Sequence, residues 1–156
     1  MAKQLTKEQK KKLYDKAMKD IDERLHGIRG IIPKMSTVAA VLKQHFPYYF
    51  WVGFYFIEEA QLVIGPYQGT SACANIGWHG VCGTGAKKKK TVIVPDVHKF
   101  PGHIVCDDRS NSEIVVPVMQ GDEVIAVLDV DSTEKNSFDD VDKYYLEKIV
   151  PILLDE

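Results

Sequence analysis

Two pairs of apolar, β-branched segments, each pair joined by a short polar turn, constrain the fold of this chain more than any other feature. Segments separated by so few residues can only pair in opposite directions, as β-hairpins. The paired segments are residues 48–57 with 62–64, and residues 114–119 with 124–130, joined at 58–60 and 120–122. The sequence therefore predicts an antiparallel sheet built from at least these two hairpins.

Helical periodicity brackets the hairpins. Apolar residues recur at helical spacing from Leu13 to Ile28, again from Val38 to Phe46, and once more from Val141 to Ile149. A shorter helix from Gly80 to the lysine run and a strand over 91–94 lie between the hairpins. The expected N-caps are Thr6, in a capping box with Gln9, then Ser36, and finally Ser137 or Asp139, with Pro151 disturbing the last turn.

The resulting order, α-α-β-β-(α)-β-β-β-α, belongs to the α+β class. At 156 residues the chain has the length of one domain, and we find no repeat or linker that divides it. We therefore expect a single domain over residues 1–156, with a central antiparallel sheet. The N- and C-terminal helices should cover one face of this sheet and the long loops the other.

Charge and cysteine content exclude several classes of protein. The formal charge of −2 gives no field that would attract nucleic acid or an anionic membrane. No apolar run approaches the roughly 18 residues that span a bilayer, and the N-terminus lacks a signal peptide, so we expect a cytoplasmic protein. Three cysteines cannot form a complete disulfide framework, which leaves metal binding or thiol chemistry.

Nucleotide and zinc motifs are weak. Residues 80–85 resemble the start of a phosphate-binding loop, but Ala86 stands where the lysine should be. Cysteines and histidines are numerous enough for zinc, yet no Cys-x-x-Cys pair is present. We therefore expect neither a bound cofactor nor a metal.

The positions of the cysteines favour thiol chemistry. Cys73 and Cys82 lie in a segment rich in glycine and small residues, and Cys106 lies in the irregular stretch 95–112. Long ordered loops are commonly functional. His103 and Arg109 are close to Cys106 in sequence, and a cation beside a thiol favours the reactive thiolate.

Acidic residues in an apolar strand form the second candidate group. With a period of two, Asp129 and Asp131 share one face with Ile125 and Val127. A plain two-residue turn would pair Glu113 with Val130, on the other face, whereas a longer loop or a bulge would bring it level with the two aspartates. Grouped carboxylates suit an ammonium group and raise the pKa of one member.

Two aromatic residues of the first hairpin have two readings. Trp51 and Tyr55 could form a wall beside these acids, or they could simply pack in the core.

Taken together, these segments resemble the free methionine-(R)-sulfoxide reductases, which are GAF domains. The resemblance runs from about Trp51 to the last helix. It rests on residues 62–69, Gly80-Val-Cys-Gly-Thr84, Pro95-Asp-Val-His98, Gly102-His-Ile-Val-Cys-Asp107, Ser110-Asn-Ser-Glu-Ile-Val115 and Val127-Leu-Asp-Val-Asp-Ser132. Between Cys73 and Cys82 the chain is about one residue shorter than is usual in the family, with Trp78 and His79 in that interval.

The resemblance implies a role for each candidate. By position, Cys106 matches the nucleophile, Cys73 the resolving cysteine and Cys82 a further redox cysteine. The family's substrate-binding acids match Glu113, Asp129 and Asp131, and its aromatic wall matches Trp51.

As a function, the resemblance implies reduction of free methionine sulfoxide through a sulfenic acid and a disulfide. An NADPH-linked thioredoxin, or a similar dithiol, would then recycle the cysteines. GAF domains often pair through their terminal helices, so a homodimer is expected. The alternative is a non-catalytic GAF domain that senses a small ligand or redox state.

Overall fold

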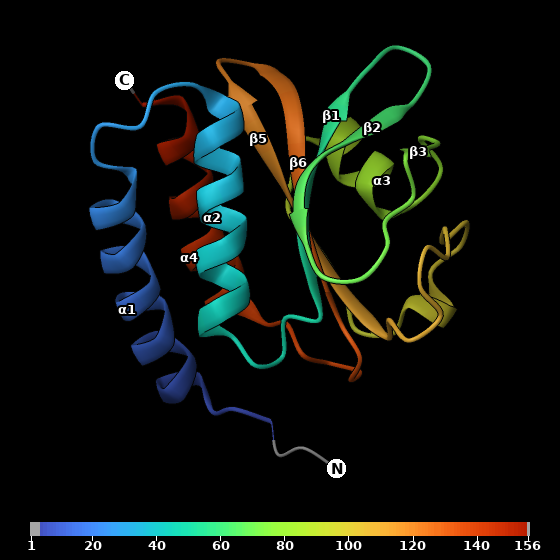
Figure 1. Ribbon diagram of the computed structural model, residues 1–156. Coiled ribbons are helices and arrows are strands. Elements are labelled where there is room, and N and C mark those ends of the chain that lie inside the picture. Colours follow the sequence, from blue (N-terminus) through green and yellow to red (C-terminus); the bar gives the residue numbers. More distant parts are fainter. Residues whose placement is uncertain (1–3, 156) are drawn as a thin grey trace.

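The computed structural model describes residues 4–155. It contains one sheet in which all neighbouring strands run antiparallel (Figure 1). The sheet has six strands in the order β3-β2-β1-β6-β5-β4. Both predicted hairpins are confirmed, as β1 with β2 and β5 with β6. The strands are β1 (Trp51–Ile57), β2 (Leu62–Gln68), β3 (Asn75–Ile76), β4 (Val92–Val94), β5 (Ser112–Gln120) and β6 (Glu123–Ser132).

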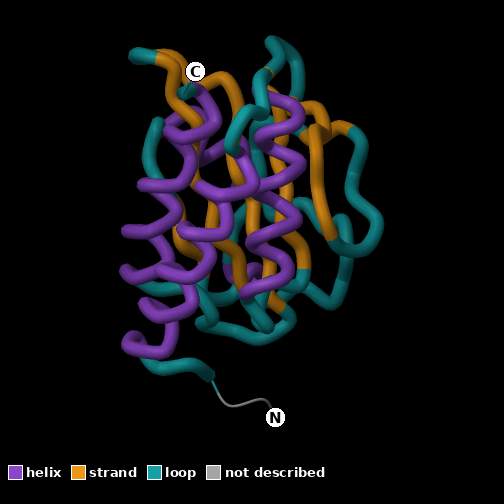
Figure 2. Tube along the Cα trace, turned by 60° about the vertical axis from the view of Figure 1, so that its left-hand side comes forward, coloured by secondary structure: helices purple, strands orange, loops and turns teal. Residues whose placement is uncertain are grey.

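Three helices form a layer on one face of the sheet, as predicted (Figures 1 and 2). Helices α2 and α4 contact the strands, and α1 packs on both of them. The long loops and α3 lie over the opposite face. No helix among residues 4–155 is long and apolar enough to cross a bilayer. The helices are α1 (Lys7–Leu25), α2 (Ile31–His45), α3 (Val81–Lys88) and α4 (Asp140–Ile149), with short 3-10 turns η1 (Val97–Lys99) and η2 (Val150–Leu154).

The helix caps confirm two predictions and correct one. Thr6 caps α1 in the expected capping box, and of the two candidates for the last helix, Ser137 and Asp139, it is Asp139 that caps α4. The prediction of Ser36 as a cap is wrong, because α2 begins at Ile31 after Gly30, whose φ is 92°. Pro33 lies in the first turn of α2, where a missing N–H removes no helical hydrogen bond, so this proline is compatible with the start of the helix.

The pleat of the central strands separates two apolar clusters. One face of β1, β5 and β6 packs against the helices and is fully buried, for example at Phe54, Ile114 and Leu128. The alternate residues of the same strands face α3 and the loops. This second face carries the buried carboxyl groups of the central strands. Because side chains alternate between the two faces of a strand, these groups lie beside one another.

A buried ion pair joins the two ends of the chain. The Lys10 Nζ atom in α1 lies 2.6 Å from an Asp142 carboxylate oxygen in α4, and both side chains are at most 5% exposed. The other oxygen of Asp142 accepts hydrogen bonds from the hydroxyls of Tyr14 and Tyr48. Since a buried charge without partners is costly, this network holds the helical layer in one arrangement.

Candidate active site

A register shift between β5 and β6 decides where Glu113 lies. At the turn Gln120 pairs with Glu123, as in a two-residue loop, but the pairing then shifts so that Ile125 has no partner. Beyond this bulge Glu113 pairs with Asp131. Of the two alternatives left open by the sequence, the bulge is confirmed, and it brings all three predicted acids to one face of the sheet.

The same bulge corrects one detail of the prediction. We expected Ile125 to share a face with Asp129 and Asp131, whereas it packs against the cluster on the helix side. The extra residue reverses the alternation at this point, so that Val124 takes the place of Ile125 on the acidic face.

Strand β1 adds the aromatic side of the site. Trp51 pairs with Asp131, and Tyr55 lies four pairs further along, opposite Val127 and on the same face. Between them, a Cβ atom at Gly53 would lie only 2.7 Å from the Trp51 ring, so glycine makes room for the indole along its own strand. Trp51 and Tyr55 are about as buried as core residues, at 5% and 3% exposure, and they also border a cavity. Trp51 and Tyr55 therefore pack in the core and also lie beside the acids, so the two interpretations of these aromatics are compatible.

The three cysteines lie in two different states. Cys73, in the loop after β2, forms a disulfide with Cys106, in the loop before β5, with their Cα atoms 5.4 Å apart. Cys82 is a free, buried thiol in the first turn of α3. Gly83 permits this position, because a Cβ there would lie 2.0 Å from the Trp78 carbonyl oxygen.

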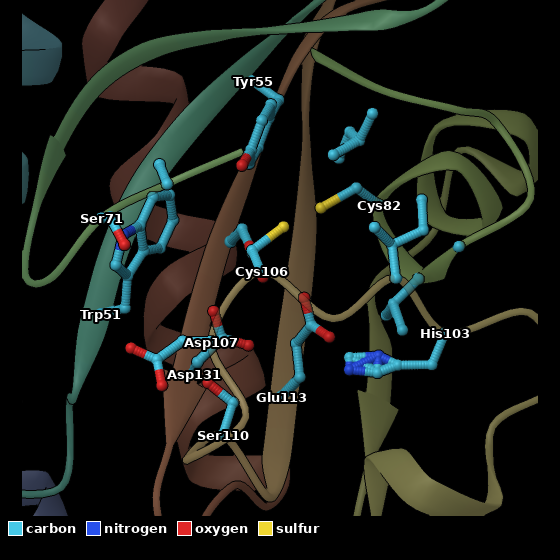
Figure 3. Close-up of a pocket in the computed structure, with 16 residues that line it drawn as sticks. Trp51, Tyr55, Ser71, Cys82, His103, Cys106, Asp107, Ser110, Glu113 and Asp131 are labelled. Atoms are coloured by element: carbon cyan, nitrogen blue, oxygen red, sulfur yellow. The ribbon is translucent and has the colours of Figure 1, made fainter. Parts of the chain in front are cut away.

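A cavity of about 50 Å³ collects the predicted site residues (Figure 3). Seven of the eight border it, and Cys73 does not. In Figure 3 the side chains of Glu113, Cys82 and Cys106 point toward the same central space. The lining residues that the sequence did not single out include Ser71, Ile76, Ile104, Asp107 and Ser110, and His103, expected only as a cation near Cys106, also borders the cavity. Most of these residues lie within four positions of Cys106 in the sequence. Their proximity to a candidate reactive cysteine was therefore the signal from which they could have been predicted as site residues.

Burial and mutual repulsion keep protons on these acids. Burial, then the carboxylates of Asp129 and Asp131, raises the pKa of Glu113 well above its usual value. Burial also raises the pKa of Asp131 strongly and that of Asp129, although the neighbouring polar groups of Glu113 and Cys82 oppose the shift at Asp129. The pKa of the Cys82 thiol is raised by burial and by the same carboxylates, so this sulfur stays protonated.

Three polar atoms of cavity-lining residues have no hydrogen-bond partner within the described part of the chain. They are Trp51 Nε1, which is a donor, Asp129 Oδ1, which is an acceptor, and His103 Nδ1. Buried polar groups without partners are costly, and in native proteins they commonly serve a ligand. The cavity therefore suits a small ligand with both donors and acceptors.

Arg109 and His103, the side chains expected to favour the Cys106 thiolate, do not act on its sulfur in this structure. Arg109 donates two side-chain hydrogen bonds to the Asp107 carboxylate, and its guanidinium carbon lies 5.0 Å from the centre of the Phe50 ring. Burial lowers the pKa of His103, which favours the neutral imidazole. In this disulfide form, neither side chain supplies a charge directed at the sulfur of Cys106.

Asp107 instead links the two loops that the disulfide joins. Its carboxylate accepts a hydrogen bond of 2.8 Å from the Thr70 hydroxyl, three residues before Cys73. The Asp107 side chain is only 12% exposed, and its pKa is lowered mainly by Arg109 and also by Thr70. A non-covalent contact thus holds Cys73 and Cys106 close to each other in parallel with the covalent bond.

Replacing Thr70 with valine should weaken this contact without changing the shape of the side chain. Since a hydrogen bond to a charged group contributes about 1.5–3 kcal/mol, the Cys73–Cys106 disulfide should become roughly tenfold or more easier to reduce at equilibrium with glutathione if the contact is lost on reduction. Thr91→Val, which removes a similar Thr–carboxylate contact to Glu147, is the matched control and should leave the equilibrium unchanged. An unchanged equilibrium in Thr70→Val would contradict the prediction.

Comparisons with known proteins agree with this geometry. Residues 37–152 match the GAF domain family. The chain is 45% identical to GAF domain-containing protein A of Dictyostelium discoideum, over 96% of each chain, and 37% identical to the free methionine-R-sulfoxide reductase of Escherichia coli, over 90% of this chain and 86% of that protein.

Among solved structures, the free methionine-R-sulfoxide reductase of Neisseria meningitidis, in complex with its substrate, superposes with a TM-score of 0.85 at 35% identity. The match covers 98% of this chain and 90% of that one. The resemblance inferred from the sequence motifs is thereby confirmed, including its fold. This chain belongs to the free methionine-(R)-sulfoxide reductase family of GAF domains.

Proposed function

We propose that this chain reduces free methionine (R)-sulfoxide to methionine, with two of its cysteine thiols as the electron donors. The observation that carries the proposal is the Cys73–Cys106 disulfide, one end of which borders a cavity with three buried carboxyl groups. This disulfide is the product state that a thiol-dependent reduction leaves behind.

In the first step, the Cys106 thiolate attacks the sulfoxide sulfur. Oxygen can leave that sulfur only if it is protonated, and Glu113 or Asp131, each held in the protonated form by burial, is placed to supply the proton. With a second proton from solvent the oxygen departs as water, which leaves Cys106 Sγ bonded to the positively charged methionine sulfur. A water molecule then attacks Cys106 Sγ and returns a proton to solvent. Neutral methionine departs and Cys106 is left as a sulfenic acid. Cys82 is a poorer nucleophile in this arrangement, because its raised pKa keeps it a thiol.

In the second step, the Cys73 thiol attacks the sulfenic acid of Cys106, forms the disulfide and releases water. Two thiols thus become one disulfide while one sulfoxide becomes one sulfide, so two electrons and two protons are transferred. All of these electrons come from sulfur, and the reaction needs no bound cofactor. The partner of Cys106 is Cys73 in the structure, while Cys82 is available as a further redox cysteine.

Selection of the free amino acid follows from charge. The ammonium group of free methionine sulfoxide would be paired by Asp129 and its neighbouring acids, whose repulsion it relieves. A methionine within a peptide has an amide at that position and cannot make this pairing. Trp51 and Tyr55 would contact the apolar end of the substrate.

The test is turnover of three substrates in a coupled assay with NADPH, thioredoxin reductase and thioredoxin. We expect consumption of NADPH with the free R epimer, and little with the free S epimer or with an N-acetylated, C-amidated R sulfoxide. A ligand sensor would bind the sulfoxide and release no methionine. Absence of turnover with the R epimer, in protein whose disulfide is reduced beforehand, would refute the proposed function.

We further propose a thioredoxin-type dithiol as the physiological reductant and a cytoplasmic location, where such dithiols are kept reduced. Cys106 is exposed in the disulfide, and the adjacent Val105 is 64% exposed. An exposed apolar side chain beside an exposed disulfide can contact the protein surface that surrounds the attacking thiol of the reductant.

Val105→Glu should therefore raise the KM for thioredoxin about fivefold or more, while turnover with dithiothreitol stays constant. Dithiothreitol is too small to need the apolar contact, so it reports on the chemistry alone. The control is Ile32→Glu, which places the same charge on a residue 50% exposed in α2, in the helical layer. Equal losses with both reductants would assign Val105 to the fold instead of to docking.

We also propose that the chain forms a homodimer. Pairing would use the helical layer, because the opposite face carries the cavity and the disulfide that a reductant must reach. Light scattering on the purified chain measures the mass directly, and a mass of one chain at micromolar concentration would exclude this pairing.

A further inference from the structure

We propose that the disulfide form of this chain binds a soft divalent cation, such as Zn²⁺ or Cd²⁺, between Cys82, Glu113 and Asp129. One potential ligand atom from each residue lies within 4.8 Å of the other two. The three side chains are among the most buried polar groups of the chain, at 4%, 5% and 6% exposure. Among residues 4–155 this is the group of acidic and sulfur side chains that meets such a spacing.

The spacing of the three ligand atoms, each within 4.8 Å of the others, is compatible with a tetrahedral site. Zinc–sulfur bonds of about 2.3 Å and zinc–oxygen bonds of about 2.1 Å place the ligands of one ion roughly 3.4–3.6 Å apart. Small rotations of side chains held on α3, β5 and β6 would close the remaining difference. The fourth position would face the cavity, which has room for water.

An independent observation points to a missing cation. Asp129 Oδ1 is buried and accepts no hydrogen bond in the described structure, although Asp129 borders the cavity. A carboxylate oxygen in that situation is costly. The titratable groups that act on Glu113 and Cys82 are all acidic, and these groups hold protons because ionising them together would bring negative charges into mutual repulsion. A divalent ion would convert this mutual repulsion into attraction.

The choice of ion follows from the ligand set. A thiolate with two carboxylates favours zinc or cadmium over magnesium or calcium, which bind all-oxygen sites. The bound ion would occupy the space that the proposed function assigns to the substrate ammonium group, and it would therefore act as an inhibitor. Binding itself does not depend on that function, because it requires only the three side chains.

The experiment uses the disulfide form, in which Cys82 is the one free thiol and therefore the only sulfur able to bind a metal as a thiolate. Cd²⁺ is titrated into this protein, and the ultraviolet charge-transfer absorption of a cadmium–thiolate bond is recorded. We expect one equivalent of Cd²⁺ per chain and no competition from millimolar Mg²⁺. Zn²⁺ should displace the Cd²⁺.

Two variants and a control decide the outcome. Cys82→Ser should abolish the absorption band, and Asp129→Asn should weaken cadmium binding at least tenfold. Glu123→Gln, an exposed acid at the start of the same strand, should change nothing. The proposal is overturned if Cd²⁺ gives no band, if the band survives in Cys82→Ser, or if Asp129→Asn binds as tightly as the unaltered chain. Near-ultraviolet circular dichroism identifies a variant that has lost its fold.

Discussion

Cys106→Ser should lower the turnover of free methionine (R)-sulfoxide by about 10³-fold or more, because a serine hydroxyl cannot replace a thiolate as nucleophile and then accept reduction. The effect should be the largest of any single sulfur substitution in the chain. The coupled NADPH assay measures it, and the fold of the variant is checked by its circular dichroism spectrum.

A single-turnover experiment separates the roles of the cysteines. Each protein is fully reduced, freed of reductant and mixed with excess sulfoxide, and the released methionine is counted. The unaltered chain should release one equivalent. Cys73→Ser should also release one equivalent and accumulate a sulfenic acid that a dione reagent traps, because only the second step is lost. Cys106→Ser should release none. If Cys106→Ser gave one equivalent and Cys82→Ser none, the nucleophile would be Cys82.

Glu113→Gln should have opposite effects on activity and on stability. Turnover should fall by about 10²–10⁴-fold, the range typical for loss of a general acid, because the amide has no proton to give to the departing oxygen. The free energy of unfolding at neutral pH should rise by roughly 1–2 kcal/mol, as it commonly does when a functional group held in an unfavourable environment is replaced.

The sign of the stability change follows from the direction of the pKa shift. Burial and neighbouring acids raise the pKa of Glu113 in the folded state above its unfolded value. The folded chain then holds a proton that the unfolded chain has lost, so stability falls as the pH rises from the unfolded pKa through the folded one. Glu113→Gln removes this part of the dependence, so its gain should be small at acid pH and largest at neutral and alkaline pH.

Urea unfolding at a series of pH values measures this difference, with Glu123→Gln as the control for an exposed acid. A variant that loses stability at every pH would show that the Glu113 carboxyl supports the fold, and the assignment of Glu113 as a strained acid would then be wrong.

Local signals in the sequence were sufficient for most of the fold. Thr6 and Asp139 have side chains that satisfy helix N–H groups whatever the rest of the chain does, and both caps were found. Ser36 failed because a serine within a helix looks the same in sequence as one before it. The two hairpins were found because alternation and short turns are properties of neighbouring residues.

The site was only partly accessible to sequence reasoning, because its members meet through tertiary structure. The candidates themselves were identified by residue type and by family resemblance. The face that Glu113 occupies depends on one unpaired residue, Ile125. An isoleucine has no conformational preference from which a bulge could be predicted. The disulfide partner of Cys106 depends on the paths of two loops, which is why geometry, and not spacing, separates Cys73 from Cys82. The contact between Thr70 and Asp107 was missed for the same reason.

The unpaired Ile125 has a consequence for how members of this family can differ in length. It lies near the tip of the β5–β6 hairpin, several residues from the carboxyl groups. It nevertheless sets which residues of β5 pair with which residues of β6, and therefore which of them share a face of the sheet. Loss of a single residue there would turn Glu113 toward the helices and an isoleucine or valine toward the cavity. The number of residues at this tip should therefore be as strictly maintained as the acids themselves, although the tip does not border the cavity.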